Sequence, residues 1–207
     1  MYNSYLVIGS ARSGLATTKY LINQGKEVYL SDMNLELLPK ARNILNKLPV
    51  KNFIFGRQPK VADLGVEAVI ISPGIPLSIS PIMEANNLNI PVFGEIEMAF
   101  ESTNANIIGI TGTNGKTTTT SLVGHLLESN DYRSAVVGNI GVPMIEIAPQ
   151  LDENDVLICE LSSFQLDTII NFRSNIALIL NLTPDHLDRH HSIENYLEAK
   201  ANILKNQ

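Results

Sequence analysis

A glycine loop around one lysine is the strongest chemical feature of the sequence. The stretch "ITGTNGKTTTTSL" spans residues 110–122 and places Lys116 directly before Thr117. An apolar strand that enters such a loop and continues into a helix presents backbone N–H groups and the positive end of the helix dipole to an anion. Lys116 adds a full charge, and the Thr117 hydroxyl suits a magnesium ion. The sequence therefore predicts a phosphate-binding loop.

The spacing of this loop departs from the usual pattern G-x-x-x-x-G-K-[ST]. That pattern requires glycine at position 110, where the sequence has Ile110, and the leading glycine is instead Gly112. A glycine turn with a solvated lysine is the alternative interpretation. We favour phosphate binding, because a strand precedes the loop and a helix follows it.

A second glycine stretch, "GSARSG" at residues 9–14, resembles the dinucleotide fingerprint G-x-G-x-x-G. Asp32 ends the next strand, where an acid that binds ribose would lie. The middle glycine is replaced by Ala11, whose Cβ disfavours the close approach of a pyrophosphate and hence NAD. A nucleoside diphosphate in another pose could still use Ser13 N–H and the Arg12 guanidinium. A purely structural turn is the alternative.

Two further apolar strands, "DVLICEL" and "NIALILNL", are followed by Glu160 and His186. Ligands of open α/β sheets bind beyond the carboxyl ends of the strands, so we expect both side chains to gather near Lys116. Glu160 is a candidate magnesium ligand or else a satisfied polar residue at a strand end. His186 is a candidate site residue or else a helix cap.

Other polar residues near the end of the chain give weaker indications. We expect His190 and His191 to be solvated loop residues. By spacing alone, Lys200 in "IENYLEAKANIL" reads as an exposed lysine of a helix.

Short β-branched runs alternate with helical patterns through the first 93 residues, as in "YLVIGS", "GLATTKYLINQG", "EVYLSD" and "AVIISPG". This alternation predicts the α/β class, with a Rossmann-like parallel sheet. A polar break after "IPVFGEIEMAFES" then leads into a second, P-loop-type α/β domain. We predict the boundary between residues 93 and 106, and domains at 1–93 and 94–207.

Composition narrows the function further. The chain has 207 residues, 44% hydrophobic, with a net charge of -6 and a pI near 5.2, which argues against nucleic-acid binding. Cys159 is the single cysteine and cannot form an internal disulfide. We find no pattern of a signal peptide or membrane span, and expect a cytoplasmic protein that binds neither membrane nor nucleic acid.

The motifs taken together resemble the Mur ligases. "TGTNGKTT", "GNIG", "ELSSFQL" and "NLTPDHLDRH" follow "GSARSG" and "SPGIP" in the order typical of that family. The resemblance is strongest to the branch that joins D-glutamate to UDP-N-acetylmuramoyl-L-alanine in peptidoglycan synthesis. "ELSSFQL" and "SPGIP" discriminate best, since the lysine loop alone would also fit folylpolyglutamate synthetases, which lack the first domain.

The resemblance implies an N-terminal domain for the UDP substrate, a central ATPase and a C-terminal domain for D-glutamate. Against that pattern the chain stops within the central domain, so we expect a monomeric fragment that does not ligate alone. The expected chemistry is an acyl phosphate made from ATP and attacked by the D-glutamate amine. The alternatives are another Mur ligase or a folylpolyglutamate-synthetase-like ligase, a P-loop kinase or NTPase, and a non-catalytic nucleotide-binding module.

The resemblance also implies roles for individual residues. It implies two magnesium ions, the first on Thr117 and the second on Glu160 and His186, with Lys200 as a carbamate. A basic residue expected shortly after Asp32 is missing from "SDMNLE". The residues implied for the ATP phosphates are Gly112, Thr113, Asn114, Gly115, Lys116, Thr117 and Thr118. Those implied for the muramoyl substrate are Arg12, Ser13, Asp32, Gly74, Asn139, Ser162 and Gln165.

Overall fold

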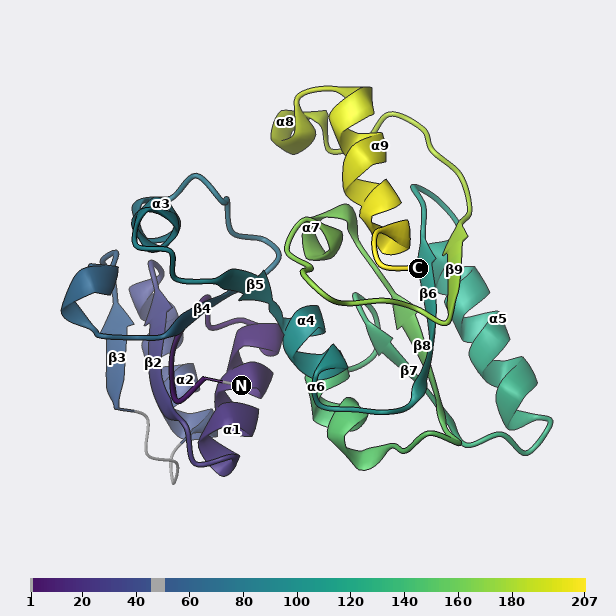
Figure 1. Cartoon of the computed structure of the whole chain (residues 1–207), viewed down its shortest axis with the longest axis horizontal. Coiled ribbons are helices and arrows are strands. Elements are labelled where there is room, and N and C mark those ends of the chain that lie inside the picture. Colours follow the sequence, from purple (N-terminus) through teal and green to yellow (C-terminus); the bar gives the residue numbers. More distant parts are fainter. Residues whose placement is uncertain (1, 46–50) are drawn as a thin grey trace. The chain divides into compact units, whose positions relative to one another are not determined.

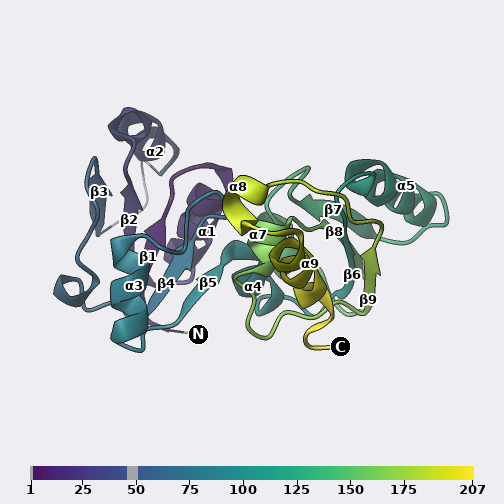
Figure 2. The same ribbon diagram turned by 90° about the horizontal axis from the view of Figure 1, so that it is seen from above.

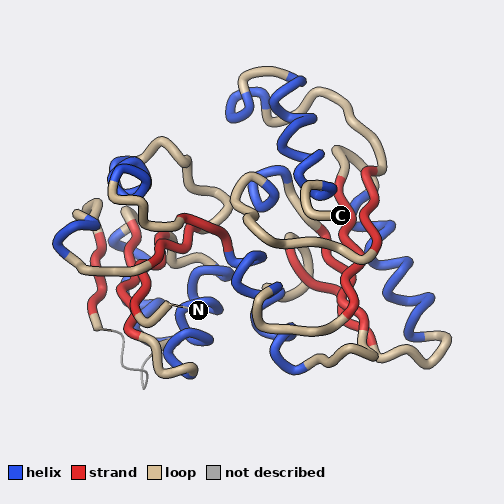
Figure 3. Tube along the Cα trace, viewed as in Figure 1, coloured by secondary structure: helices blue, strands red, loops and turns tan. Residues whose placement is uncertain are grey.

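The computed structural model describes residues 2–45 and 51–207, which form two compact units, Met1–Glu95 and Ile96–Gln207 (Figure 1). Each unit contains one sheet whose paired strands are all parallel, so the predicted α/β class is confirmed. In Figure 3 the strands of each unit run side by side, with helices and loops around them. Among the described residues, no helix is long and apolar enough to cross a membrane.

The first unit has a five-stranded sheet in the order β3-β2-β1-β4-β5. The central strands β1 and β4 are mostly apolar, as expected of strands that are covered on both faces, and the residues Tyr5–Val7 of β1 are fully buried. A core cluster that includes Leu6, Val69 and Ile82 fills the space between the sheet and α3. The elements are β1 (Ser4–Ile8), α1 (Arg12–Asn23), β2 (Glu27–Asp32), α2 (Leu38–Ile44), β3 (Asn52–Phe55), β4 (Ala68–Ile71), α3 (Ser80–Asn87) and β5 (Val92–Gly94).

The turn between β1 and α1 requires glycine at two positions. Gly9 has φ +101°, a left-handed conformation that other residues rarely adopt. A Cβ on Gly14 would overlap the carbonyl oxygen of Gly9, so the helix can begin this close to the strand only with glycine there. Both glycines of the "GSARSG" stretch therefore have a structural reason that is independent of any ligand.

The second unit has a four-stranded sheet in the order β7-β8-β6-β9. The edge strand β9 is the least covered, since Ile176 is 54% exposed and Ile179 is 36% exposed. The elements are α4 (Glu95–Phe100), β6 (Asn106–Thr111), α5 (Lys116–Glu128), β7 (Ser134–Gly138), α6 (Met144–Ile147), β8 (Val156–Glu160), α7 (Ser163–Leu166), β9 (Ile176–Ile179), α8 (Leu187–His190) and α9 (Ile193–Ala201).

Helices cover both faces of this second sheet (Figures 1 and 2). Helix α5 packs on the face of Val136, because a Cβ on Gly124 would lie 2.6 Å from Val136 Cγ2. Ile203, just after α9, packs on the face of Gly109, where an added Cβ would lie 3.1 Å from Ile203 Cδ1. Val136 shares a row of the sheet with Ile108, the neighbour of Gly109 along β6. Since successive residues of a strand point to opposite faces, α5 and Ile203 lie on opposite sides.

A buried carboxylate ties α4 to the loop that follows α7. Glu97 is 1% exposed, and its carboxylate accepts hydrogen bonds from the backbone N–H groups of Ile170, Asn171 and Phe172 at 2.8, 2.7 and 3.0 Å. Backbone donors that are buried away from water need such partners. Glu97 therefore pairs three backbone N–H groups of this turn that would otherwise lack an acceptor within the protein.

Candidate functional site

The carboxyl ends of the central strands of the second sheet meet at one edge. Glu160, the last residue of β8, is in register with Ile110 of β6 and with Gly138 of β7. Strand β6 ends at Thr111, and α5 begins five residues later at Lys116. The loop, Glu160 and the segment after β7 are therefore neighbours because the strands are parallel and in register.

The loop carries Lys116 on a left-handed turn. Gly112 has φ +148° and Gly115 has φ +81°, and Gly115 is the N-cap residue of α5. Lys116 folds back over the loop, since its Nζ donates to the carbonyl oxygens of Gly112 and Thr113, both at 2.9 Å. The ammonium group is thus held above the N-terminus of α5, where an anion is favoured.

The chain after β9 braces this loop. The N–H of Thr113 donates to the carbonyl oxygen of Asn181 at 3.1 Å, and the Thr113 hydroxyl donates to that of Thr183 at 3.1 Å. The N–H of Asn114 donates to the side-chain oxygen of Asn181 at 2.9 Å. The loop conformation is therefore set by tertiary contacts as well as by its glycines.

Glu160 lies at the centre of the edge with neutral partners. It is 1% exposed, and it accepts hydrogen bonds from the Thr117 hydroxyl and the Asn139 amide, both at 2.8 Å. None of the ion pairs within the described ranges involves it. A carboxylate that is buried without a cation is costly, so this group is suited to a metal ion that is hard and prefers oxygen ligands.

Lys200 is buried, and the expectation of an exposed helix lysine is wrong. It is 1% exposed, its Nζ donates to the Gly112 carbonyl oxygen at 2.8 Å, and it lies 4.5 Å from the centroid of the Tyr196 ring. The buried residues of α9 and the turn after it are Tyr196, Ala199, Lys200 and Ile203. That spacing is the apolar stripe of an amphipathic helix, so the position of Lys200 within the stripe was a signal for its burial.

Two ammonium groups therefore converge on one carbonyl oxygen, that of Gly112. Neither Lys116 nor Lys200 forms an ion pair in the part of the chain that the structure describes. Burial is the main reason that the pKa of Lys200 is lowered to about 8, and the charge of Lys116 lowers it further, while Asp185 opposes this shift. The arrangement fits an anion with several charges, which would relieve the repulsion between the two lysines.

The lowered pKa of Lys200 predicts a rise of stability with pH. Between pH 8 and the ordinary value of 10.5, the unfolded chain holds a proton that the folded chain has released. Stability therefore increases across that window, by about 2 kcal/mol. Urea unfolding of the chain at pH 7.5 and pH 10 should show the rise, and Lys200→Met should abolish it. Lys205→Met, on an exposed residue, should keep it. The same pH dependence in Lys200→Met would contradict the prediction.

The structure places His186 near α7 and α9. Its ring centroid is 5.1 Å from that of Phe164 and 6.3 Å from that of Tyr196, and its side chain is 49% exposed. Its backbone is left-handed, with φ +50°, and it is the N-cap residue of α8. No group of three His, Cys, Asp or Glu residues forms a ready metal site within residues 2–45 and 51–207. His186 and Glu160 thus lie in the same unit without a direct contact being observed.

His190 is also buried, so the expectation of a solvated residue is wrong for it. It is 7% exposed, and its Nε2 lies 2.9 Å from Ser163 Oγ. Desolvation is the main reason that the pKa of His190 is lowered, and Asp167 partly opposes that shift. Sequence reasoning missed this contact, because the polar run around His190 has no apolar periodicity. His191 is exposed, as expected.

The candidates Ser162 and Gln165 are engaged with each other. The Ser162 hydroxyl accepts from the Gln165 N–H at 3.2 Å, while the Gln165 side-chain oxygen accepts from the Ser162 N–H at 2.9 Å. This reciprocal pair is a capping box at the start of α7. It fixes the orientation of both side chains at the carboxyl edge of the sheet.

In the first unit, Asp32 holds the glycine turn in place. Its Oδ2 accepts from the Ser10 N–H and the Ser10 hydroxyl, both at 2.7 Å, and its Oδ1 accepts from the Asn34 N–H at 2.8 Å. Arg12 is exposed at the start of α1 and Ser13 is half-buried. Asp32 thus joins the ends of β1 and β2 at the edge where a nucleotide would bind.

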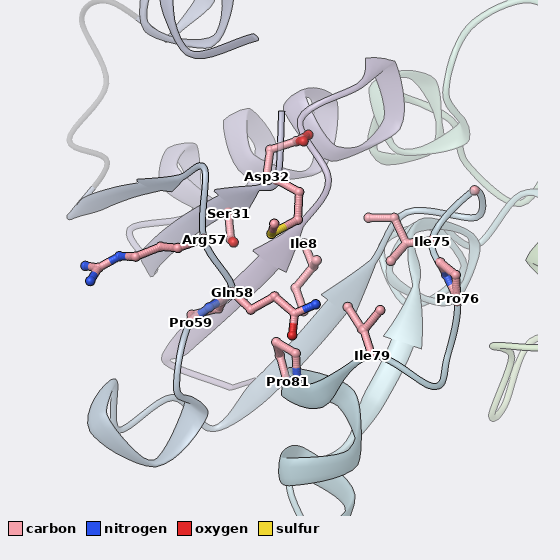
Figure 4. Close-up of a pocket in the computed structure, with 12 residues that line it drawn as sticks. Ile8, Ser31, Asp32, Arg57, Gln58, Pro59, Ile75, Pro76, Ile79 and Pro81 are labelled. Carbon is pink, nitrogen blue, oxygen red and sulfur yellow. The ribbon is translucent and has the colours of Figure 1, made fainter. Parts of the chain in front are cut away.

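A cavity of about 240 Å³ opens beside Asp32 (Figure 4). Its walls are mostly apolar, and Gly74 and Ile75 from the "SPGIP" stretch contribute to them. Figure 4 shows the amide of Gln58 pointing toward Ile79, whereas the guanidinium of Arg57 points away. The remaining lining residues are Ile8, Ser31, Met33, Pro59, Pro76 and Pro81. The size and the apolar walls suit one ring of a nucleotide.

Two family models match almost the whole chain. Residues 3–94 match the N-terminal domain of MurD-like Mur ligases, and residues 110–207 match the Mur ligase middle domain. The chain belongs to the Mur ligase family. This confirms the resemblance drawn from its motifs. Mur ligase middle domains bind ATP in this family, which agrees with the position of the lysine loop in the second unit.

Individual Mur ligases support the same assignment. UDP-N-acetylmuramoylalanine--D-glutamate ligase of Clostridioides difficile is 46% identical over 206 residues, which cover 98% of this chain and 45% of that protein. The same enzyme of Alkaliphilus oremlandii is 44% identical over 205 residues, again 98% of this chain and 45% of that protein. The chain thus spans about 45% of the length of these curated relatives.

A solved structure supports the fold. The ligase of Neisseria meningitides for UDP-N-acetylmuramate and L-alanyl-gamma-D-glutamyl-meso-diaminopimelate has a TM-score of 0.61 and 18% identity. The match covers 100% of this chain and 68% of that one. At this identity the likeness shows a shared fold alone.

Proposed function

We propose that this chain is the nucleotide-binding part of an ATP-dependent ligase that joins D-glutamate to UDP-N-acetylmuramoyl-L-alanine in peptidoglycan synthesis. The observation that carries the proposal is the convergence at the edge of the second sheet. Lys116 and Lys200 both donate to Gly112, and the buried Glu160 lies against Thr117 of the same loop. The relatives at 40–46% identity carry the name of this enzyme, which supports the choice of substrates.

The residues present fit a triphosphate and magnesium. Gly112 to Thr118 would hold the phosphates of ATP through backbone N–H groups and Lys116, at the N-terminus of a helix of 13 residues. The Thr117 hydroxyl donates a hydrogen bond to Glu160, so the lone pairs of the Thr117 oxygen are available to a cation. When bound, magnesium would neutralise part of the phosphate charge and polarise the transferred group. Two ions are proposed, the second held by Glu160 and His186.

The chemistry addresses a difficulty of amide formation. A carboxylate is a poor electrophile, and phosphorylation by ATP gives its carbonyl carbon a good leaving group. The alanyl carboxylate of the substrate would attack the γ-phosphate, forming an acyl phosphate and releasing ADP. The amine of D-glutamate would then displace phosphate. Lys116 would lower the repulsion between the two anions that must meet, since phosphoryl transfer depends chiefly on positioning and charge neutralisation.

Lys200 would serve the same site as a carbamate. Its pKa of about 8 leaves about a tenth of the amine neutral at pH 7, far more than for an ordinary lysine, and only the neutral amine attacks carbon dioxide. Loss of a proton from the adduct gives an anionic oxygen ligand, which suits a lysine placed beside a magnesium site. The burial of Lys200 beneath the loop supports this role.

Each unit offers its own proposed contacts to the UDP-sugar. In the first unit, the cavity beside Asp32 and Gly74 and the N-terminus of α1 with Arg12 and Ser13 are suited to the nucleotide. In the second unit, the proposed contacts to the muramoyl part are Asn139, Ser162 and Gln165. D-Glutamate is the proposed third substrate. We further propose that the enzyme is monomeric and acts in the cytoplasm.

A titration of the chain with three ligands tests the proposal. We expect binding of UDP-N-acetylmuramoyl-L-alanine and of Mg·ATP, and none of NAD, because Ala11 disfavours a dinucleotide. Isothermal calorimetry with each ligand separately provides the measurement. Tight binding of NAD without binding of the UDP-sugar would reject the assignment. Binding of ATP alone would instead favour a plain nucleotide-binding module.

A further inference from the structure

Ser163 and His190 form a buried contact that the proposed function does not use. Ser163 Oγ and His190 Nε2 lie 2.9 Å apart, and the two residues are 2% and 7% exposed. Either group can be the donor, depending on the tautomer of the imidazole. The contact joins the first residue of α7 to the last residue of α8, two elements that are 27 residues apart at this pair.

His190 is the residue that attaches α8 to the rest of the unit. Of the residues that the structure describes in α8, His190 alone is buried. A helix of four residues has no stability of its own, so its position depends on tertiary contacts. The imidazole stacks on Phe164 with centroids 5.2 Å apart and an interplanar angle of 6°, and it lies 5.2 Å from the Tyr196 ring.

The position of His186 follows from that of α8. His186 is the N-cap residue of this helix, and its carbonyl oxygen accepts from the His190 N–H at 2.9 Å. Its own side chain is half exposed and rests on Phe164. On the other side of the contact, Ser163 follows directly after Ser162 in the capping box of α7. The Ser163–His190 contact therefore lies between two groups of proposed site residues.

We propose that the Ser163–His190 hydrogen bond is a positioning contact that holds His186 against α7 and so couples the metal-binding part of the site to its substrate-binding part. The coupling to a metal rests on the proposed function, whereas the placement of His186 does not. Ordinary aromatic packing is the competing explanation, because the His190 ring also stacks on the Phe164 ring with centroids 5.2 Å apart. Packing and hydrogen bonding respond differently to substitution.

Two substitutions of His190 separate these explanations. His190→Phe keeps a flat ring on Phe164 but cannot bond Ser163, whereas His190→Gln loses the ring and keeps both a donor and an acceptor. If the proposal is right, His190→Gln keeps His186 against α7 as in the wild type, whereas His190→Phe does not. Packing alone expects the reverse. Ser163→Ala removes the bond from the other side with little change of volume, and it serves if a His190 variant does not fold.

The placement of His186 is measured without any ligand. Nuclear Overhauser effects between ring protons of His186 and Phe164 should be present in the wild type and in His190→Gln. They should be lost in His190→Phe and in Ser163→Ala. The double variant that carries both substitutions should resemble either single variant. His125→Gln, on an exposed position of α5, is the matched control. Retention of these effects in Ser163→Ala or His190→Phe, or their loss in His190→Gln, would overturn the placement.

The coupling is measured with Mn²⁺·ATP, whose paramagnetic ion should broaden the His186 ring signals of the wild type. We expect Ser163→Ala to weaken this binding by about 10-fold, as removal of partners that orient metal ligands does, and His190→Gln to retain it. Equal affinity in Ser163→Ala and wild type would overturn the coupling. Absence of broadening in the wild type would reject the proposed role of His186 at the metal, and the coupling with it, while the ring measurement still decides the placement.

Discussion

Replacing Lys116 by alanine is expected to reduce acyl-phosphate formation by about 10²–10³-fold in a version of the enzyme extended to the length of its relatives. The reason is electrostatic, because Lys116 lies over the N-terminus of α5 and would balance charge that builds up on the transferred phosphate. Trapping the acyl phosphate with hydroxylamine measures the effect. Binding of UDP-N-acetylmuramoyl-L-alanine should change less than about twofold, since the proposed UDP contacts are elsewhere.

Lys205→Ala is the matched control, because it removes an exposed positive charge from the same unit. It should leave acyl-phosphate formation within about twofold of the wild type. An equal loss of phosphoryl transfer and of UDP-sugar binding in Lys116→Ala would mean that the loop serves another ligand. Unchanged phosphoryl transfer would remove Lys116 from the mechanism.

Replacing Glu97 by alanine is expected to destabilise the second unit by about 3–5 kcal/mol. The substitution removes the acceptor of three backbone N–H groups, of which that of Phe172 is buried and those of Ile170 and Asn171 are partly buried. Urea unfolding monitored by circular dichroism gives the free energy. Glu97→Gln should lose less, because one amide oxygen still accepts, although its NH₂ group would face a donor.

Glu101→Ala provides the comparison for Glu97. Glu101 is exposed one residue after α4 and carries the same charge, so its removal should change the free energy of unfolding by less than about 0.5 kcal/mol. Similar effects of the two substitutions would indicate that charge, rather than the satisfied turn, is responsible.

The arrangement around Glu160 was accessible from the sequence because it depends on topology. Parallel strands in one sheet end at one edge, so a loop after β6 and an acid at the end of β8 become neighbours once the strands are adjacent. Local patterns were sufficient to predict both strands and the helix that begins at Lys116. The hydrogen bond between Thr117 and Glu160 adds the detail that only coordinates provide.

The burial of Lys200 and His190 was not predicted from the local sequence. A charged residue in a helix is normally exposed, and apart from the family resemblance only the apolar stripe that begins at Tyr196 indicated that Lys200 is buried. His190 lies in a polar run without periodicity, and its burial arises from Ser163 and Phe164, which precede it by 27 and 26 residues. Contacts of this kind are decided by tertiary packing that no local window of the sequence contains.

The exposed edge of β9 has a consequence for handling the protein at high concentration. One side of this strand pairs with β6, and its Ile176 is 54% exposed. An uncovered strand with apolar side chains is a template onto which a strand of another molecule can add. We therefore expect self-association through this edge to increase with the concentration of the chain.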